Sequence, residues 1–313
     1  RNMNTELVIL LFIIGLILIV KGGDFFVDAA VWIAKVSGIP NFIIGATIVS
    51  IATTMPELIV SLLAAGKGSV DMAAGNAVGS VTVNTAMIMG ISILFMPAIV
   101  KRSQMAVKML LMCASIAVLW IFSFNASLSI VESIIMICFY LFFIWENVRT
   151  TKQGMSSDQE KEEEKEKIDR RTVVVNAVKF ILGVVGIVWG ADLLVDNACI
   201  LARNFGIPES IIGVTIISVG TSLPELVTTI TAIVKKQSSL SVGNIIGANI
   251  IDLAVILPMC SIVSGKSLPV SAQMSGLDMP MCLVVCLIAV IPALFMKRFT
   301  KIQGGILLAV YAS

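Results

Sequence analysis

The feature that most constrains this chain is a long apolar segment that occurs twice, each time with an acidic residue at its centre. The first copy runs from Gly38 to Gly90 and the second from Gly206 to Pro258, at a constant offset of 168 residues. About a third of the aligned positions are identical, which indicates an internal structural repeat. Glu57 aligns with Glu225, and each directly follows a proline. We therefore expect two halves of similar fold, each with a buried carboxylate.

The apolar segments are too numerous and too long for a soluble domain. Hydrophobic residues make up 58% of the chain and charged residues only 13%, whereas soluble domains have about 25% charged residues. Runs of about 20 apolar residues are long enough to cross a bilayer as helices. The predicted fold class is an all-α membrane protein surrounded by lipid. No basic stripe indicates nucleic-acid binding, and histidine, the commonest general base, is absent.

Ten transmembrane helices are predicted, five in each half. The expected spans are 7–35, 41–65, 72–99, 109–124 and 128–145, then 173–202, 209–234, 240–264, 281–294 and a last one from 302. A mixed-charge run separates the halves, so we divide the chain into a first repeat (1–149), a charged linker (150–172) and a second repeat (173–313). Because five is an odd number, the halves must insert in opposite directions, which gives an inverted-topology repeat.

The basic residues predict the orientation in the membrane. With the N-terminus outside, most Lys and Arg residues fall on the inner side, including the whole linker and the groups Lys101/Arg102/Lys108, Lys235/Lys236 and Lys297/Arg298/Lys301. The positive-inside rule therefore favours an outside N-terminus and a cytoplasmic linker. The expected location is the cytoplasmic (inner) membrane, which the chain crosses many times.

Two acids lie in the first span. Asp24 and Asp28 are four residues apart and so share one helix face. We expect them near the membrane boundary, where they are solvated or paired with Lys21.

Three other acids are predicted to lie deep in the membrane: Glu57, Glu225 and Asp252. A carboxylate at the centre of a membrane helix costs about 2.5–3.5 kcal/mol. No Lys, Arg or His lies close to them in the sequence to neutralise them. Bound cations, protons or both must therefore compensate these charges, which indicates that the protein handles cations.

The neighbours of these acids supply oxygen ligands. Pro56 and Pro224 each remove a backbone donor and open their helix one turn back, and we expect this to free carbonyls around Ser50 and Ser218. The adjacent hydroxyls belong to Thr53, Thr54, Thr221 and Ser222. Oxygen-only sites suit Ca²⁺ and Na⁺, whereas zinc or copper prefers thiolate or imidazole. Broken helices at matching positions of inverted halves are typical of a transport site near the membrane midplane.

One pair of aligned positions differs in charge. Asn84 in the first half aligns with Asp252 in the second, so the four central residues carry at most three negative charges. One divalent ion would leave a residual charge and three monovalent ions would balance it; alternatively, Asp252 holds a proton beside the other carboxylates. Charge counting leaves these possibilities open.

The motifs resemble those of the cation/calcium exchanger superfamily, specifically its prokaryotic Na⁺/Ca²⁺ exchanger branch. The resemblance rests on the segment GTSLPE at residues 220–225 and GNIIGANIID at 243–252, and it extends over nearly the whole chain. It implies alternating access, with the first and sixth spans sliding as a pair across the others. It also implies a Ca²⁺ and Na⁺ site with acidic ligands Glu57 and Glu225, further oxygens from Thr53, Thr54, Thr221, Ser222, Ser50 and Ser218, and Ser80, Asn84 and Asp252 completing it.

The sequence departs from the family pattern in places. Residues 52–57 read ATTMPE instead of GTSLPE, and Ala248 stands where Ser80 stands in the other half. The proton-coupled branch has a glutamate at the position of Ser80, so the serine favours Na⁺ coupling.

Three other functions are alternatives to Na⁺/Ca²⁺ exchange. Proton-coupled or K⁺-dependent Ca²⁺ exchange is the alternative within the class. A membrane lipid phosphatase would need basic residues near the carboxylates to bind its anionic substrate, and a passive channel would more typically place its pore symmetry between subunits. Because one pseudo-symmetric chain suffices to build the site, we expect a functional monomer, and no cofactor other than the transported ions.

Overall fold

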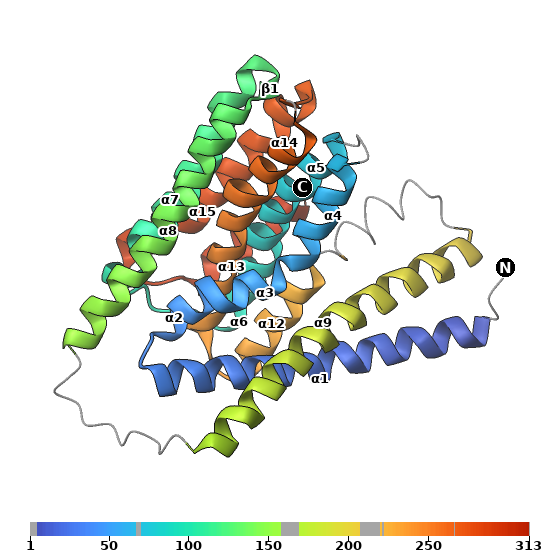
Figure 1. Cartoon of the computed structure of the whole chain (residues 1–313), viewed down its shortest axis with the longest axis vertical. Helices are drawn as coiled ribbons and strands as arrows, with labels where there is room; N and C mark the ends of the chain where they lie inside the picture. The colour runs from blue at the N-terminus through green and yellow to red at the C-terminus, as the bar shows by residue number, and fades with distance from the viewer. Residues whose placement is uncertain are drawn as a thin grey trace.

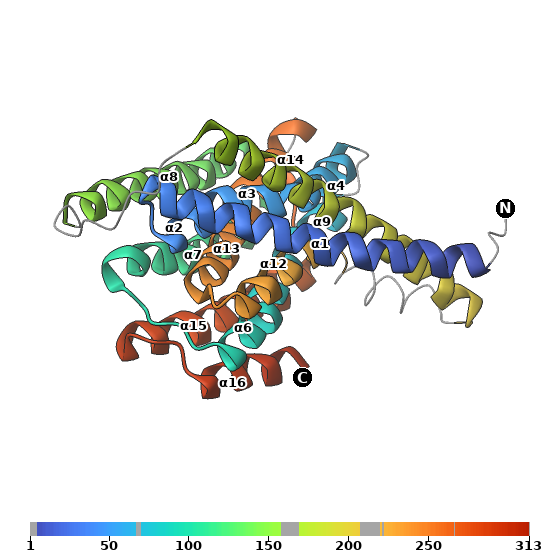
Figure 2. The same cartoon turned by 90° about the horizontal axis from the view of Figure 1, so that it is seen from below.

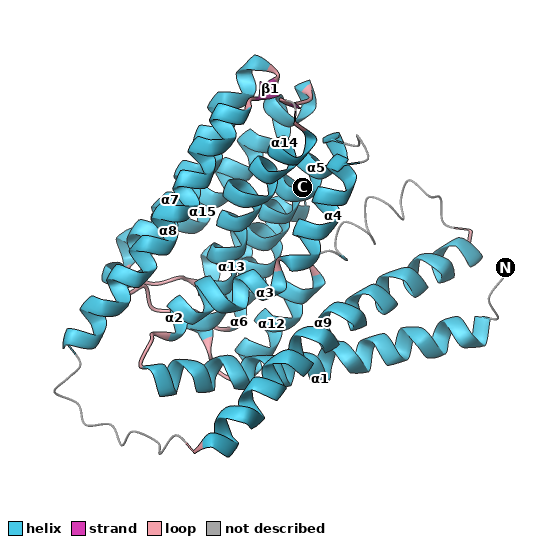
Figure 3. Ribbon diagram, in the orientation of Figure 1, coloured by secondary structure: helices cyan, strands magenta, loops and turns pink. Residues whose placement is uncertain are grey.

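The computed structural model describes residues 5–66, 70–157, 169–206, 220, 222–265 and 267–312, and nearly all of them are helical (Figure 3). The first half comprises α1 (Thr5–Ser37), α2 (Asn41–Ile44), η1 (Gly45–Val49), α3 (Ser50–Thr53), α4 (Met55–Gly66), α5 (Val70–Thr82), η2 (Val83–Met89), α6 (Gly90–Phe95), α7 (Arg102–Phe122), η3 (Ser123–Asn125), β1 (Ser127–Leu128) and α8 (Ile130–Ser157). The second comprises α9 (Arg170–Asn204), α12 (Leu223–Val234), α13 (Ser238–Ile251), η5 (Asp252–Ile256), α14 (Leu257–Ser264), β2 (Leu268–Pro269), η6 (Met274–Asp278), α15 (Met279–Met296) and α16 (Lys301–Ala312).

The helices have the lengths and the surface of membrane spans. Among the described residues, seven helices are long and apolar enough to cross a bilayer, and three shorter apolar helices cover 41–53, 223–234 and 301–312. Large apolar side chains are exposed along the outer faces of the helices, for example Leu10, Ile17, Ile181 and Trp189. Contiguous apolar surface of this kind is rare on soluble monomers, so it fits contact with lipid.

Helices α1 and α9 form a long crossed pair that lies against the remaining helices (Figures 1 and 2). Glycines bring the two backbones together, as expected where membrane helices pack closely. A Cβ at Gly22 would lie 2.8 Å from the amide nitrogen of Ile187, and one at Gly190 would lie 2.8 Å from the carbonyl oxygen of Gly15. The first helix of each half therefore packs against its counterpart.

Loops from the two halves pair with each other at two places. Strand β1, between the fourth and fifth spans of the first half, pairs antiparallel with β2, between the third and fourth spans of the second. The converse pair of loops forms an isolated bridge between Ile99 and Arg298. In each case the loop after the third span of one half meets the loop after the fourth span of the other half. This exchange agrees with a two-fold relation between the halves.

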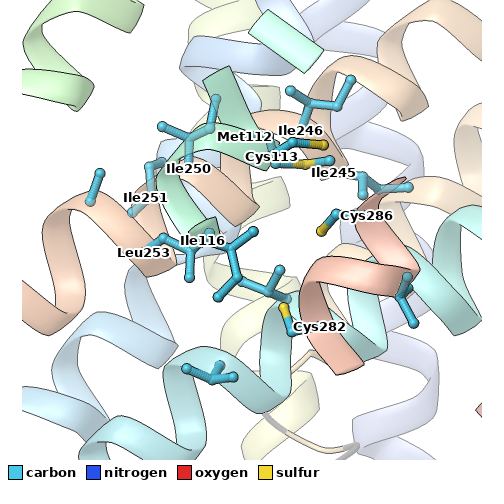
Figure 4. Packing of buried hydrophobic residues seen from close by; sticks show 14 of the residues in the cluster. Met112, Cys113, Ile116, Ile245, Ile246, Ile250, Ile251, Leu253, Cys282 and Cys286 are labelled. Carbon is cyan, nitrogen blue, oxygen red and sulfur yellow. The ribbon is translucent and has the colours of Figure 1, made fainter. Parts of the chain in front are cut away.

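The apolar core lies between the central helices α5, α7, α13 and α15 (Figure 4). Met112 and Cys113 of α7 contribute to it, as do Cys282 and Cys286 of α15, so these residues act as packing groups. Cys138, in contrast, is exposed on α8. Lys108, expected to interrupt the apolar sequence, is fully buried within α7. Its Nζ donates to the Gln104 carbonyl (2.8 Å) and to Thr150 Oγ1 (2.9 Å).

Several expected boundaries shift. Helix α8 continues to Ser157 and α9 begins at Arg170, so both ends of the expected linker are helical, and residues 158–168 lie outside the described part. The fourth span starts at Arg102 and not near residue 109, because the basic residues of its first turns bond to nearby carbonyls and hydroxyls. The partner of Asp24 and Asp28 is Lys235 of the second half, not Lys21.

Candidate cation site

The second span breaks next to Glu57, as its proline predicts. Helix α3 ends at Thr53, and α4 restarts at Met55 with Glu57 in its first turn. Pro56 has no N–H, so the carbonyl of Ala52 loses its partner. The Ser50 carbonyl, expected to be free, is bonded instead: it accepts from the Thr54 amide (2.9 Å) and the Thr53 hydroxyl (3.4 Å).

The second half places its acid in the same way. Helix α12 begins at Leu223 with Pro224 and Glu225 in its first turn. Glu57 is 1% exposed and Glu225 is fully buried. Both glutamates therefore lie in the interior, each in the first turn of a helix that follows a proline-containing motif, on helices of opposite halves.

Two threonine hydroxyls, at the break between α3 and α4, connect the two halves. Thr54 Oγ1 donates to Glu225 Oε1 at 3.1 Å. Thr53 Oγ1 donates to Oδ1 of Asn244, in α13, at 3.2 Å. Thr53 and Thr54 are 3% and 2% exposed. The hydroxyls named by the first motif thus lie beside the carboxylate of the second.

A close helix crossing makes these contacts possible. Helix α13 passes so near α2 and η1 that a Cβ at Gly243 would overlap the Phe42 carbonyl, and one at Gly247 would lie 2.5 Å from the Ala46 carbonyl oxygen and from Ser50 Oγ. Only glycine permits this approach. The crossing fixes Asn244 opposite Thr53.

Asn84 and Asp252 occupy matching irregular turns. Asn84 lies in the π-helical segment η2, and Asp252 begins the π-helical segment η5. Such widened turns are frequent at functional sites because they redirect side chains and backbone groups. Asn84 is 1% exposed and Asp252 is fully buried. The aligned positions therefore share local geometry although one is neutral and the other acidic.

The buried carboxylates have few partners. Both oxygens of Glu57, both of Asp252 and Oε2 of Glu225 make no hydrogen bond to another described residue. The three groups lie close enough for their charges to interact, and no ion pair to any of them is found among the described residues. An unpaired buried carboxylate is strongly unfavourable, so cations or protons are needed to stabilise the arrangement.

The described carboxylates do not by themselves form a metal cage. No three His, Cys, Asp or Glu side chains of the described residues are grouped as a preformed metal site. A bound cation would therefore also need neutral oxygens. Ser80 (3% exposed) and Ser222 (1% exposed) are buried, and Ser222 Oγ makes no hydrogen bond. The Ser50 hydroxyl donates to the Thr47 carbonyl at 3.1 Å. Thr221 and Ser218 lie outside the described residues.

Two polar groups beside the site are not distinguished by the sequence motifs. Asn76 and Asn244 recur at the repeat offset, and this recurrence is the signal that the sequence offers for them. Asn76 Nδ2 donates to Ser61 Oγ at 2.9 Å and to the Glu57 carbonyl at 3.5 Å. Farther out, Asn249 Nδ2 donates to Thr85 Oγ1 at 2.8 Å. Asn76 therefore holds α4, which carries Glu57, against α5, and Asn249 joins α13 to η2.

Comparison with known proteins gives a consistent result. The family model described as sodium/calcium exchanger protein matches residues 7–148 and 175–313. The chain is 29% identical to the sodium/calcium exchanger MaX1 of Methanosarcina acetivorans, over 97% of this chain and 96% of that protein. It is 34% identical to the inner membrane protein YrbG of Escherichia coli, over 81% and 79%. Crystal structures of the sodium-calcium exchanger NCX_Mj soaked with Na⁺ and Sr²⁺ superpose with a TM-score of 0.84 at 28% identity, covering 99% of this chain and 98% of that one.

Proposed function

This chain belongs to the sodium/calcium exchanger family, whose members are transporters and not enzymes, and we propose that it exchanges Na⁺ for Ca²⁺ by alternating access. It is a multi-pass membrane protein with a fold like that of NCX_Mj. The observation that carries the proposal is the set of buried carboxylate oxygens without hydrogen bonds at Glu57, Glu225 and Asp252. Neutral oxygens surround them and no basic side chain among the described residues pairs with them.

The proposed ligands are the acids Glu57, Glu225 and Asp252 with the neutral groups Asn84, Thr53, Thr54, Thr221, Ser222, Ser80, Ser50 and Ser218. Carboxylate, hydroxyl, amide and carbonyl oxygens form the hard-ligand mixture that Ca²⁺ and Na⁺ prefer. Thr54 belongs to the first half, and its hydroxyl donates to Glu225 of the second half. Both halves would therefore contribute to the coordination of a bound ion.

The proposed topology is ten spans in two inverted five-span repeats, 1–149 and 173–313, joined by a charged linker at 150–172. The N-terminus lies outside, the linker lies in the cytoplasm, and the membrane is the inner one. The reciprocal loop pairs β1–β2 and Ile99–Arg298 support the inverted relation. One chain contains both halves of the site, so we propose a functional monomer.

Two features favour Na⁺ over H⁺ as the coupling ion. Ser80, a neutral hydroxyl, stands where a proton-carrying glutamate would be expected in the proton-coupled branch. The site also contains several neutral oxygens suited to Na⁺. Proton or K⁺ coupling through Asp252 is the alternative within the class.

The test is Ca²⁺ uptake into proteoliposomes loaded with Na⁺, for the wild type and for Glu225→Gln. We expect uptake driven by outward Na⁺ in the wild type and none in the variant, which keeps the shape of the side chain but loses its charge. Cys138→Ser is the control, because Cys138 is exposed on α8 and its replacement leaves the site unchanged. Folded wild-type protein without such uptake would contradict the proposal.

A further inference from the structure

One face of α12 carries hydroxyls beyond Glu225. Thr228 and Thr229 follow the glutamate by one helical turn, and the aligned residues of the first half are Val60 and Ser61. Both threonines are fully buried, and within the described part of the chain neither hydroxyl makes a hydrogen bond. The interior next to Glu225 is therefore more polar than the aligned sequence in the first half.

This bonding state differs from that of other helical hydroxyls in the chain. Thr82, Ser115 and Thr151 donate to the carbonyl one turn back, at 3.1, 2.8 and 2.9 Å respectively. Back-bonding of this kind is the ordinary way to satisfy a helical hydroxyl. Because leaving a buried hydroxyl unpaired is costly, the side chains of Thr228 and Thr229 indicate a ligand outside their own helix.

The asparagines confirm that the halves differ here. In the first half, Asn76 Nδ2 donates to Ser61 Oγ at 2.9 Å. In the second, the aligned Asn244 accepts from Thr53 instead (3.2 Å), and its Nδ2 has no hydrogen-bond partner among the described residues. Thr229 aligns with Ser61, but Asn244 does not donate a hydrogen bond to it as Asn76 does to Ser61. Hydroxyl and amide groups next to Glu225 are both available to a ligand.

The opposite end of α12 is polar and covered by α1. Lys235 Nζ lies 2.6 Å from Asp28 Oδ1 and 3.0 Å from the Asp24 carbonyl. Between this ion pair and Glu225, α1 packs on the other side of α12: a Cβ at Gly23 would lie 2.8 Å from Thr231 Oγ1 and 2.9 Å from Val227 Cγ1. With 3.6 residues per turn, these two residues lie opposite Thr229 on the helix. At 1.5 Å rise per residue, about 15 Å of helix separates Glu225 from Lys235.

We propose that Thr228 and Thr229 line a step for a partly hydrated cation along the Glu225 face of α12, between Glu225 and the Lys235 end of the helix. The inference rests on the proposed function and extends it. Neutral hydroxyls replace part of the water shell of a hard cation. They bind it less tightly than a further carboxylate would, and an ion must be held loosely enough to leave. The Asn244 amide donates to a water that remains on the ion.

The test compares Thr228→Val, Thr229→Val and the double variant with Thr151→Val, the same replacement at a back-bonded hydroxyl in α8. Two quantities are measured: equilibrium binding of radioactive Ca²⁺ to purified protein, and the initial rate of Ca²⁺/Ca²⁺ self-exchange in proteoliposomes, which needs no Na⁺. Losing hydrogen-bonding groups that face a charge slows exchange in the double variant about tenfold or more. Binding stays close to that of the wild type, and Thr151→Val changes neither quantity. Thr228→Ser/Thr229→Ser, which retains both hydroxyls, restores the rate.

The outcomes separate this step from the function on which it rests. An unchanged exchange rate in the folded double variant overturns the step, and so does an equal loss of binding and rate, which would make the threonines ligands of the central site. A rate that serine does not restore also contradicts it. Wild-type protein that binds no Ca²⁺ would overturn the proposed function itself, and this is measured on the wild type alone.

Discussion

Replacing Gly243 by alanine tests the helix crossing that holds the candidate site together. The added Cβ would overlap the Phe42 carbonyl, and a backbone group has no rotamer through which to move away. Overpacking of this kind costs about 1–3 kcal/mol, and the better helix propensity of alanine returns at most about 1 kcal/mol. We expect a net loss of about 1–2 kcal/mol in the free energy of unfolding.

The same change should weaken ion binding. Asn244 is the next residue, and its 3.2 Å bond to Thr53 depends on the distance between α13 and α3. Separation of these helices misplaces Thr53 and Thr54 relative to Glu225, and a loss of about 1.4 kcal/mol corresponds to tenfold weaker Ca²⁺ binding.

The assay combines thermal unfolding of the purified protein with a Ca²⁺-binding titration. Gly305→Ala is the matched control, because Gly305 lies in α16 and an added Cβ there meets nothing within 4 Å. We expect Gly243→Ala to lower Tm by a few degrees, at about 2–4 °C per kcal/mol, and Gly305→Ala to leave it unchanged or raise it. If both variants kept the stability and Ca²⁺ affinity of the wild type, the argument from close packing would be refuted.

Three further predictions concern single charged groups. Glu57→Gln should abolish the stabilisation of the protein by Ca²⁺ in a thermal-shift titration, because it removes one of the three buried charges; undiminished stabilisation would exclude Glu57 as a ligand. Asp252→Asn should retain Ca²⁺ binding but alter the dependence of transport on monovalent ions, measured as Ca²⁺ flux against external Na⁺ and K⁺; complete loss of Ca²⁺ binding would contradict this assignment. Lys235→Met removes a half-exposed ion pair worth at most about 1 kcal/mol, so the free energy of unfolding should barely change. The Ca²⁺ exchange rate should change, because the pair joins α1 to α12. An unchanged rate would show that the pair does not restrain α1.

Much of the fold follows from the sequence because its strongest signals are local. Apolar length indicates each span, and the prolines mark the starts of the helices that carry Glu57 and Glu225 in their first turns. Boundaries in polar regions were less predictable. Lys108 looked like an interruption, but its bond to Thr150 on another helix allows α7 to continue through it. Such a contact joins residues distant in the sequence, and hydropathy does not register it.

In the candidate site too, local sequence signals were predictive, whereas contacts between residues distant in the sequence were not. Repeat alignment selected Asn84 and Asp252, and the structure gives them matching π-helical turns. The pairing of Asp24 and Asp28 with Lys235 was not predicted, because Lys21 is nearer along the chain. The contrast between Asn76 and Asn244 was also invisible, since the sequence presents identical residues at aligned positions while their partners differ in space.

The most direct test of Na⁺/Ca²⁺ exchange is to measure radioactive Ca²⁺ uptake in one proteoliposome preparation under three imposed gradients: outward Na⁺, outward K⁺ and a pH difference. The account predicts uptake with the Na⁺ gradient and only background uptake with the other two. Uptake driven by the pH difference alone, with no response to Na⁺, would contradict Na⁺ coupling and make Asp252 the first residue to examine as a proton carrier.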